Sequence, residues 1–341
     1  MHTAELDGLT YRCLEGCGFC CTFTPEVSGL ELKAIQGKFP SLKVVRAGES
    51  LLLPFQGSCG ACALLKDRTC TAYDERPAHC RYFPFHVYFG RRTEVYVNRT
   101  CRGVEPASGQ HLRNQFKTDV LDLVPPRRLQ QEQEKANKVH AQFEAIARKE
   151  NAWGDVDAEL ARLVALGPTW FDGKAWPVEA PVPREEAWEQ AFIPFADEDP
   201  VARPYHLEAS LRWLCFRGTP DRILADALSE DGRLAQAADL GAFSHWPVLP
   251  LTVQRGLAEV LARLARRDLF AGSVYALVDE TQYQLTVAEA AAAQVAQTAA
   301  DLVLRAAILQ KMGYPEASLA SEAERFLDSA FLDQPTIGGF L

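Results

Sequence analysis

Nine of the ten cysteines in this 341-residue chain lie between Cys13 and Cys101, and only Cys215 lies beyond them. The first residues of the chain contain no run of apolar side chains that would direct secretion. In a reducing compartment thiols stay unpaired, so a dense cluster of them favours metal ligation over a disulfide framework. The distribution therefore predicts a metal-binding segment at the start of a cytoplasmic protein.

The spacing of these thiols is typical of metal ligands. Cys17 and Cys20 are separated by two residues, and the same step recurs at Cys59 and Cys62. Thiolates at this spacing converge on one metal at about 2.3 Å without straining the backbone. Nine thiols could fill two four-coordinate sites and leave one over. The candidate ligands are Cys13, Cys17, Cys20, Cys21, Cys59, Cys62, Cys70, Cys80 and Cys101.

Two other interpretations of the cluster stay open at this point. Free cysteine is often a small buried hydrophobic residue, which would need no ligand. A disulfide framework is the second alternative, although an odd number of cysteines suits it poorly. Cys215 differs from the others because it is isolated in the apolar stretch SLRWLCFRG, which we expect to be helical. We therefore expect Cys215 in the hydrophobic core.

Three motifs in the cysteine segment resemble a known family. They are Cys17-Gly-Phe-Cys-Cys21, Cys62-Ala-Leu-Leu and Cys70-Thr-Ala-Tyr-Asp-Glu-Arg-Pro-Ala-His-Cys80-Arg-Tyr-Phe-Pro84. Together they resemble the YkgJ-type cysteine-cluster family over residues 9–105, which implies a zinc- or iron-chelating domain and, in some members, an iron–sulfur oxidoreductase. The sequence departs from the family pattern in the three-residue gap after Cys13 and in the additional Cys59. A flagellin lysine N-methylase carries a similar cluster, so the resemblance also associates methyl transfer with this pattern.

Charged and imidazole side chains lie beside the thiols in the sequence. A short helix is expected from about Asp74 to Arg81 with Pro77 at its first position, which would place Cys80 on its last turn. Arg76 and Arg81 would then offset the negative charge of a thiolate centre, or pair with Asp74 and Glu75 on a solvated face. His79 and His86 are weaker candidate ligands, because thiols alone can saturate the sites.

The hydrophobic pattern predicts an α+β fold in two parts. Residues 1–105 are expected to form a small loop-rich cysteine–metal domain with a β-hairpin at Phe83–Asn98, and residues 106–341 a mainly helical domain. Within the first part, a capping box at Ser28 predicts a helix to about Phe39, and Val44–Phe55 is expected as a strand or hairpin. Further helices are expected at Arg127–Asn151, Asp155–Leu166, Pro204–Phe216, Pro220–Ala227, Leu251–Asp268, Thr286–Met312 and Ser318–Phe331, with an irregular connection over Gly167–Pro204.

Composition narrows the classes of partner. A formal charge of −9 disfavours nucleic-acid binding, which normally requires a basic face. The most apolar stretch, Leu285–Met312, contains too many polar groups for a membrane span. The second part contains no phosphate-binding loop, zinc-protease motif or nucleophile elbow, so no catalytic residue is predicted.

The sequence thus favours a metal-binding protein with an unidentified protein or redox partner. An iron–sulfur cluster, [4Fe–4S] in preference to other types, is favoured over Zn²⁺, although tetrahedral thiolate sites suit both metals. The number of thiols would allow two metal sites. The alternatives are a lysine N-methylase-like enzyme acting on a protein substrate and a zinc-stabilised interaction module without catalysis.

Overall fold

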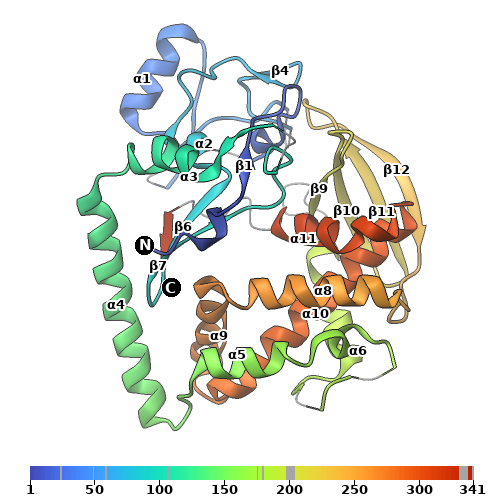
Figure 1. Ribbon diagram of the computed structural model, residues 1–341. Helices are drawn as coiled ribbons and strands as arrows, with labels where there is room; N and C mark the ends of the chain where they lie inside the picture. Colours follow the sequence, from blue (N-terminus) through green and yellow to red (C-terminus); the bar gives the residue numbers. More distant parts are fainter. Residues whose placement is uncertain are drawn as a thin grey trace.

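The computed structural model describes residues 1–23, 25–48, 50–57, 60–105, 108–174, 176–178, 180–196, 204–329 and 337–339. Helices and small, mostly antiparallel sheets make up this part of the chain, which confirms the predicted α+β class. The long helix α4 (Pro126–Lys149) and the sheet β9–β12 lie on opposite sides of the molecule (Figure 1). None of the helices described is both long and apolar enough to cross a membrane.

The cysteine segment folds into short elements joined by loops. The capping box at Ser28 forms as predicted, because the Ser28 side chain accepts from the Glu31 amide while the Glu31 carboxylate accepts from the Ser28 amide. The expected hairpin forms as β6–β7, and the stretch expected as a strand or hairpin contains the antiparallel pair β2–β3. The elements are η1 (Ala4–Leu6), β1 (Thr10–Tyr11), η2 (Phe19–Cys21), α1 (Gly29–Lys38), β2 (Val45–Ala47), β3 (Ser50–Leu52), β4 (Leu65–Lys66), β5 (Thr69–Cys70), α2 (Ala78–Tyr82), β6 (Phe85–Phe89) and β7 (Thr93–Val97).

The helix around Cys80 is shorter than predicted. It was expected from about Asp74, but α2 begins at Ala78 and Pro77 is its N-cap with an extended ψ of 154°. A proline disfavours helical geometry at the residue before it, so Arg76 cannot belong to the same helix. Cys80 consequently lies in the middle of α2.

Helices predominate after residue 105, and five of the expected ones are found within a few residues of their predicted ends. The helix α9 was not predicted, and the described part of the proline-rich connection contains three short helices of its own. The elements are β8 (Gln110–His111), α3 (Leu112–Phe116), the π-turn η3 (Lys117–Leu121), α4, α5 (Val156–Val164), η4 (Gly167–Phe171), α6 (Arg184–Gln190), α7 (Ile193–Ala196), α8 (Leu251–Leu264), α9 (Asp268–Glu280), α10 (Val287–Lys311), η5 (Glu316–Ser318) and α11 (Leu319–Ser329).

The helices predicted at 204–216 and 220–227 are wrong. This stretch forms an antiparallel sheet in the order β12-β11-β10-β9, built from β9 (Tyr205–Leu207), β10 (Trp213–Thr219), β11 (Arg222–Leu228) and β12 (Leu234–Gly241). The apolar run of β10 is only a few residues long, and runs of that length do not distinguish a buried strand from a helix. Gly218, with a φ of 143°, allows the tight turn into β11, because a Cβ there would meet the Arg222 carbonyl.

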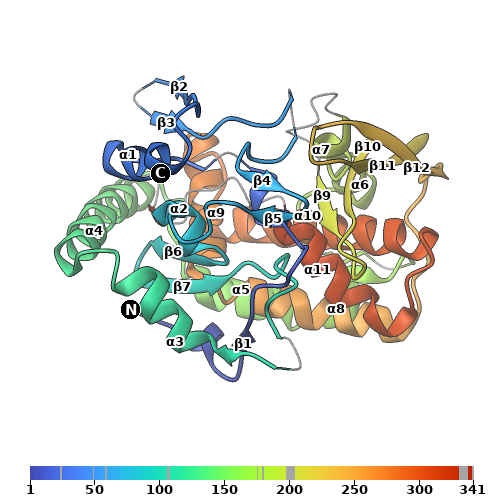
Figure 2. The same ribbon diagram turned by 90° about the horizontal axis from the view of Figure 1, so that it is seen from above.

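Packing connects the two parts of the chain. The largest core cluster includes Phe85 from β6 together with Leu257 from α8 and Leu304 from α10. β13 (Ile337–Gly339), near the end of the chain, pairs in parallel with β6. A second core cluster joins Phe19 of the cysteine segment to Trp213 of β10. Figure 2 shows β4 and β5 beside the sheet that contains β9. The division of the chain at residue 105 stays a prediction.

Candidate metal centre

Eight of the nine predicted ligands lie within the described residues, and Cys59 lies outside them. The cysteines that are described are all free of disulfide bonds. Those eight lie on five separate stretches of the cysteine segment. The first stretch carries Cys13 and Cys17 in the loop before η2 and Cys20 and Cys21 in η2 itself. The other four stretches carry one thiol each: Cys62 before β4, Cys70 at the end of β5, Cys80 in α2 and Cys101 after β7.

Backbone amides hold several of these sulfurs in the same way. The N–H two residues further along the chain donates to the sulfur at Cys17, Cys62, Cys70 and Cys101. Such hydrogen bonds stabilise the thiolate form, which is the form that binds metals. The local backbone of the segment therefore prepares four of its thiols for ligation.

The turn around Cys17 is fixed by β10. The indole Nε1 of Trp213 donates to the Cys17 carbonyl oxygen at 2.9 Å, and the Arg68 guanidinium lies 3.8 Å from the centre of the indole ring. Gly18 has a φ of 57°, and a Cβ at this position would come within 3.2 Å of both Leu65 and Trp213. Local spacing cannot indicate this contact, because Trp213 is almost two hundred residues from Cys17 in the sequence.

The thiols influence one another through hydrogen bonds and charge. Cys21 is hydrogen-bonded to the sulfurs of both Cys20 and Cys70. Its hydrogen bond is the main cause that lowers the pKa of Cys20, and it lowers the pKa of Cys70 to about 7. Burial raises the pKa of Cys17 and of Cys62 to about 11. A metal cation would offset both the burial and the mutual repulsion of these thiolates.

The two arginines predicted near the thiols have different surroundings. The positive charge of Arg76 favours the thiolate form of Cys13, Cys20, Cys70 and Cys80, although it is not the largest influence on any of them. Its guanidinium also stacks 3.5 Å from the centre of the Tyr73 ring. Arg81 instead lies near Glu31 and Tyr82. Glu75 pairs with Lys38, at 2.5 Å, so the predicted solvated pairing with the arginines is not the arrangement found.

The two histidines each pack against an aromatic ring. His79 packs against Phe23, with ring centres 5.6 Å apart, and its charged neighbours are Glu26 and Glu31. His86 is buried in β6 and stacks on Tyr96, with ring centres 4.9 Å apart.

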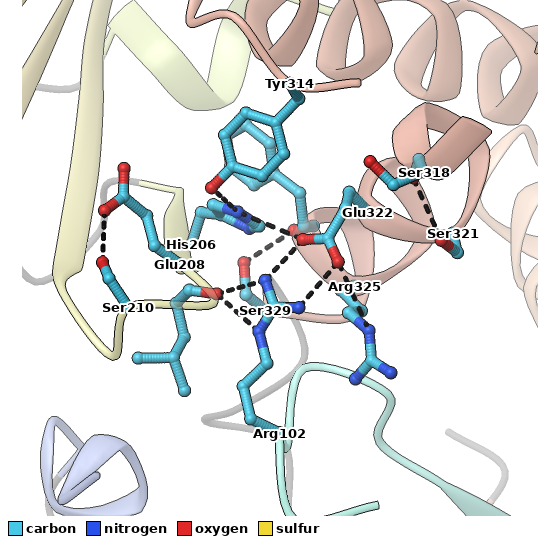
Figure 3. A network of polar contacts seen from close by, with 12 residues as sticks. Arg102, His206, Glu208, Ser210, Tyr314, Ser318, Ser321, Glu322, Arg325 and Ser329 are labelled. Carbon is cyan, nitrogen blue, oxygen red and sulfur yellow. Dashed lines mark hydrogen bonds and ion pairs between the residues drawn. The ribbon is translucent and has the colours of Figure 1, made fainter. Parts of the chain in front are cut away.

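A polar network anchors the loop that carries Cys101 (Figure 3). Arg102 forms a bidentate ion pair with Glu322 of α11, with one Nη1–Oε1 distance of 2.6 Å, and donates to the Leu207 carbonyl oxygen of β9. Arg325, one turn along α11, donates to the Arg99 carbonyl at 2.6 Å. We call Arg102, Glu322 and Arg325 the α11 clamp. Of these contacts, the sequence could indicate only that Glu322 and Arg325, three residues apart, share one face of a helix.

The chemistry of the donor set suits a thiolate-bound metal, since thiolates bind zinc and iron, and several of these sulfurs have backbone donors and a nearby cation. Within the described ranges, no group of three or more His, Cys, Asp or Glu side chains already has the arrangement that would hold a metal ion.

Residues 12–102 match the family model CxxCxxCC, described as a "putative zinc- or iron-chelating domain". This match confirms the cysteine-cluster family that the motifs resemble, and it supports a zinc- or iron-chelating role for this segment. No curated protein and no solved structure matches the chain.

Proposed function

We propose that this protein holds an iron–sulfur cluster on the thiols of its cysteine segment and uses it in a redox reaction with a protein partner. The observation that carries the proposal is the convergence of eight thiols from five separate stretches of chain. Each is near enough to another for their charges to interact. The proposal places the site in the reducing compartment expected from the sequence.

Two features favour an iron–sulfur cluster, of the [4Fe–4S] type, over zinc. Backbone N–H groups donate to four of the sulfurs, and hydrogen bonds to sulfur tune the potential of iron–sulfur centres. Arg76 places a cation beside four thiols, which would balance an anionic cluster. When bound, such a cluster would supply electron transfer, whereas zinc in a closed thiolate shell would supply folding energy only.

The experiment compares single serine variants after anaerobic purification. We expect Cys20→Ser and Cys80→Ser each to lower the bound metal at least twofold, because both sulfurs lie inside the cluster of thiols. Cys215→Ser is the matched control, because this buried thiol lies in β10 and donates to the Asp226 carbonyl oxygen at 3.6 Å. Metal lost from Cys215→Ser, or retained in full by the other two, would contradict the assignment.

A further inference from the structure

Polar side chains interrupt the apolar pattern of the largely buried helix α10. Gln294, Thr298 and Asp301 stand at positions i, i+4 and i+7, so they share one side of the helix. A polar group buried in an apolar core costs free energy unless it has a partner. These three residues instead line a cavity of about 130 Å³, which accounts for the polar side of α10.

The other walls of this cavity are mainly apolar. Leu264 ends α8, Leu269 and Phe270 lie in the first turn of α9, and Leu327 belongs to α11. Cavities of about 150 Å³ with apolar walls bind a molecule of the size of benzene. The cavity therefore has the volume for a single six-membered ring.

Tyr96 of β7 also lines the cavity. Its ring stacks on His86, with ring centres 4.9 Å apart, and the Arg267 guanidinium lies 5.0 Å from the centre of the Tyr96 ring, so the ring is held in one orientation. Tyr96 is only 5% exposed, and its hydroxyl forms no hydrogen bond within the described part of the chain. A buried phenol hydroxyl normally has a partner, so a bound molecule with a polar group would complete this site.

The charged groups at the cavity already have partners of opposite charge. Arg267 Nε lies 2.7 Å from Glu5 Oε1, and Arg267 Nη1 lies 3.5 Å from Asp328 Oδ1. Asp301 Oδ1 lies 3.4 Å from Nη1 of Arg305, one turn further along α10. A charged ligand would be buried here without a counter-charge of its own, which is costly. The lining therefore favours an uncharged molecule.

We infer that this cavity is a binding site for an uncharged molecule, about the size of one ring, that carries a hydroxyl or a similar hydrogen-bonding group. The apolar walls bind the ring, and the Tyr96 hydroxyl binds the polar group and fixes the orientation. The Gln294 amide is a second polar group available at the cavity. The inference goes beyond the proposed function and needs no metal, since no cysteine is among the described residues that line the cavity.

The test uses phenol as the probe and the full-length protein at pH 7, where phenol is uncharged. Isothermal titration calorimetry compares phenol with benzene, which lacks the hydroxyl, and with benzoate, which is charged. Phenol should bind more tightly than benzene because it pairs with Tyr96, and benzoate should not bind because its charge would be buried.

Two substitutions at the cavity and one outside it locate the binding. Tyr96→Phe should weaken phenol binding about fivefold and leave benzene binding unchanged, because one hydrogen bond is lost. Ser273→Leu adds bulk at the α9 wall of the cavity and should abolish the binding of both. Tyr283→Phe is the matched control, because the Tyr283 hydroxyl lies outside the cavity and donates to Asp279 at 2.6 Å.

Circular dichroism verifies that each variant is folded. Failure of phenol to bind the wild type, or an unchanged phenol affinity in Tyr96→Phe, would overturn the inference. Binding retained in full by Ser273→Leu would place phenol elsewhere on the protein, and benzoate bound as tightly as phenol would overturn the choice of an uncharged ligand. If Ser273→Leu does not fold, the difference in phenol affinity between Tyr96→Phe and Tyr283→Phe decides the question.

Discussion

His86 and His206 are buried without charge in the folded protein. Burial is the main cause that lowers the pKa of each to about 3, with Arg267 adding to the effect at His86 and Arg102 at His206. In the unfolded chain the pKa of histidine is near 6.5. Between these two values the unfolded state binds more protons, so the stability contributed by each histidine falls as the pH falls below about 6.5.

His86→Phe should reduce this sensitivity to acid. Within the described part of the chain, neither ring nitrogen of His86 has a hydrogen-bond partner, and a phenyl ring can preserve the stacking on Tyr96. We expect the variant to be at least as stable as the wild type at pH 7 and to gain about 2 kcal/mol relative to it at pH 5. Urea unfolding at the two pH values measures the difference. Parallel losses of stability in both proteins would show that His86 is not the group responsible.

At the scale of elements, the α11 clamp holds the Cys101 loop against the helical part of the chain. The Arg102–Glu322 pair is largely buried, with side chains 11% and 10% exposed. Glu322→Gln leaves the Arg102 charge without a full counter-charge, and breaking a buried pair in this way costs about 3 kcal/mol. Urea unfolding at constant pH would detect a loss of that size.

The control for the clamp is an exposed pair of the same kind. Arg222 and Asp239 pair across β11 and β12 with side chains 61% and 42% exposed. Solvent screens such a pair, so Asp239→Asn should change the free energy of unfolding much less than Glu322→Gln. Equal effects of the two substitutions would mean that the clamp is no stronger than an ordinary surface ion pair.

Local signals in the sequence were sufficient for some elements and insufficient for others. The capping boxes at Ser28 and Thr286 set the start of α1 and α10, because both depend on residues within one turn. The strands β10 and β11 were missed because burial against other parts of the chain, not local propensity, decides their conformation. Trp213 is fully buried, which a short apolar run cannot indicate.

The candidate site shows the same division between local and distant information. Thiol spacing indicated the ligands because metal-binding turns are local. The α11 clamp depends on contacts between residues more than two hundred positions apart, so spacing could not indicate it. Two contacts in this segment likewise depend on backbone hydrogen bonds between loops, from the Arg12 amide to the Gly103 carbonyl and from the Cys62 amide to the Cys21 carbonyl.

At the scale of the whole molecule, the cysteine segment and the helices share one core, but the metal would act on only part of it. Removing the metal with a chelator should lower the protection of residues 12–102 and of β10 against hydrogen exchange, since the Trp213 indole is hydrogen-bonded to the Cys17 carbonyl. The buried helix α10 should keep its protection. Hydrogen exchange with and without metal tests this expectation. Equal loss of protection in α10 would mean that the metal supports the entire fold.

The central claim, that the thiols hold an iron–sulfur cluster, is tested most directly by analysing wild-type protein purified without oxygen. Metal content, acid-labile sulfide and the visible absorption spectrum would be measured on one sample. The account predicts iron and sulfide in comparable amounts, with visible absorption that disappears on chelation. Stoichiometric zinc with no visible absorption would contradict the redox role, and a metal-free protein with all of its thiols titratable would contradict the metal centre altogether.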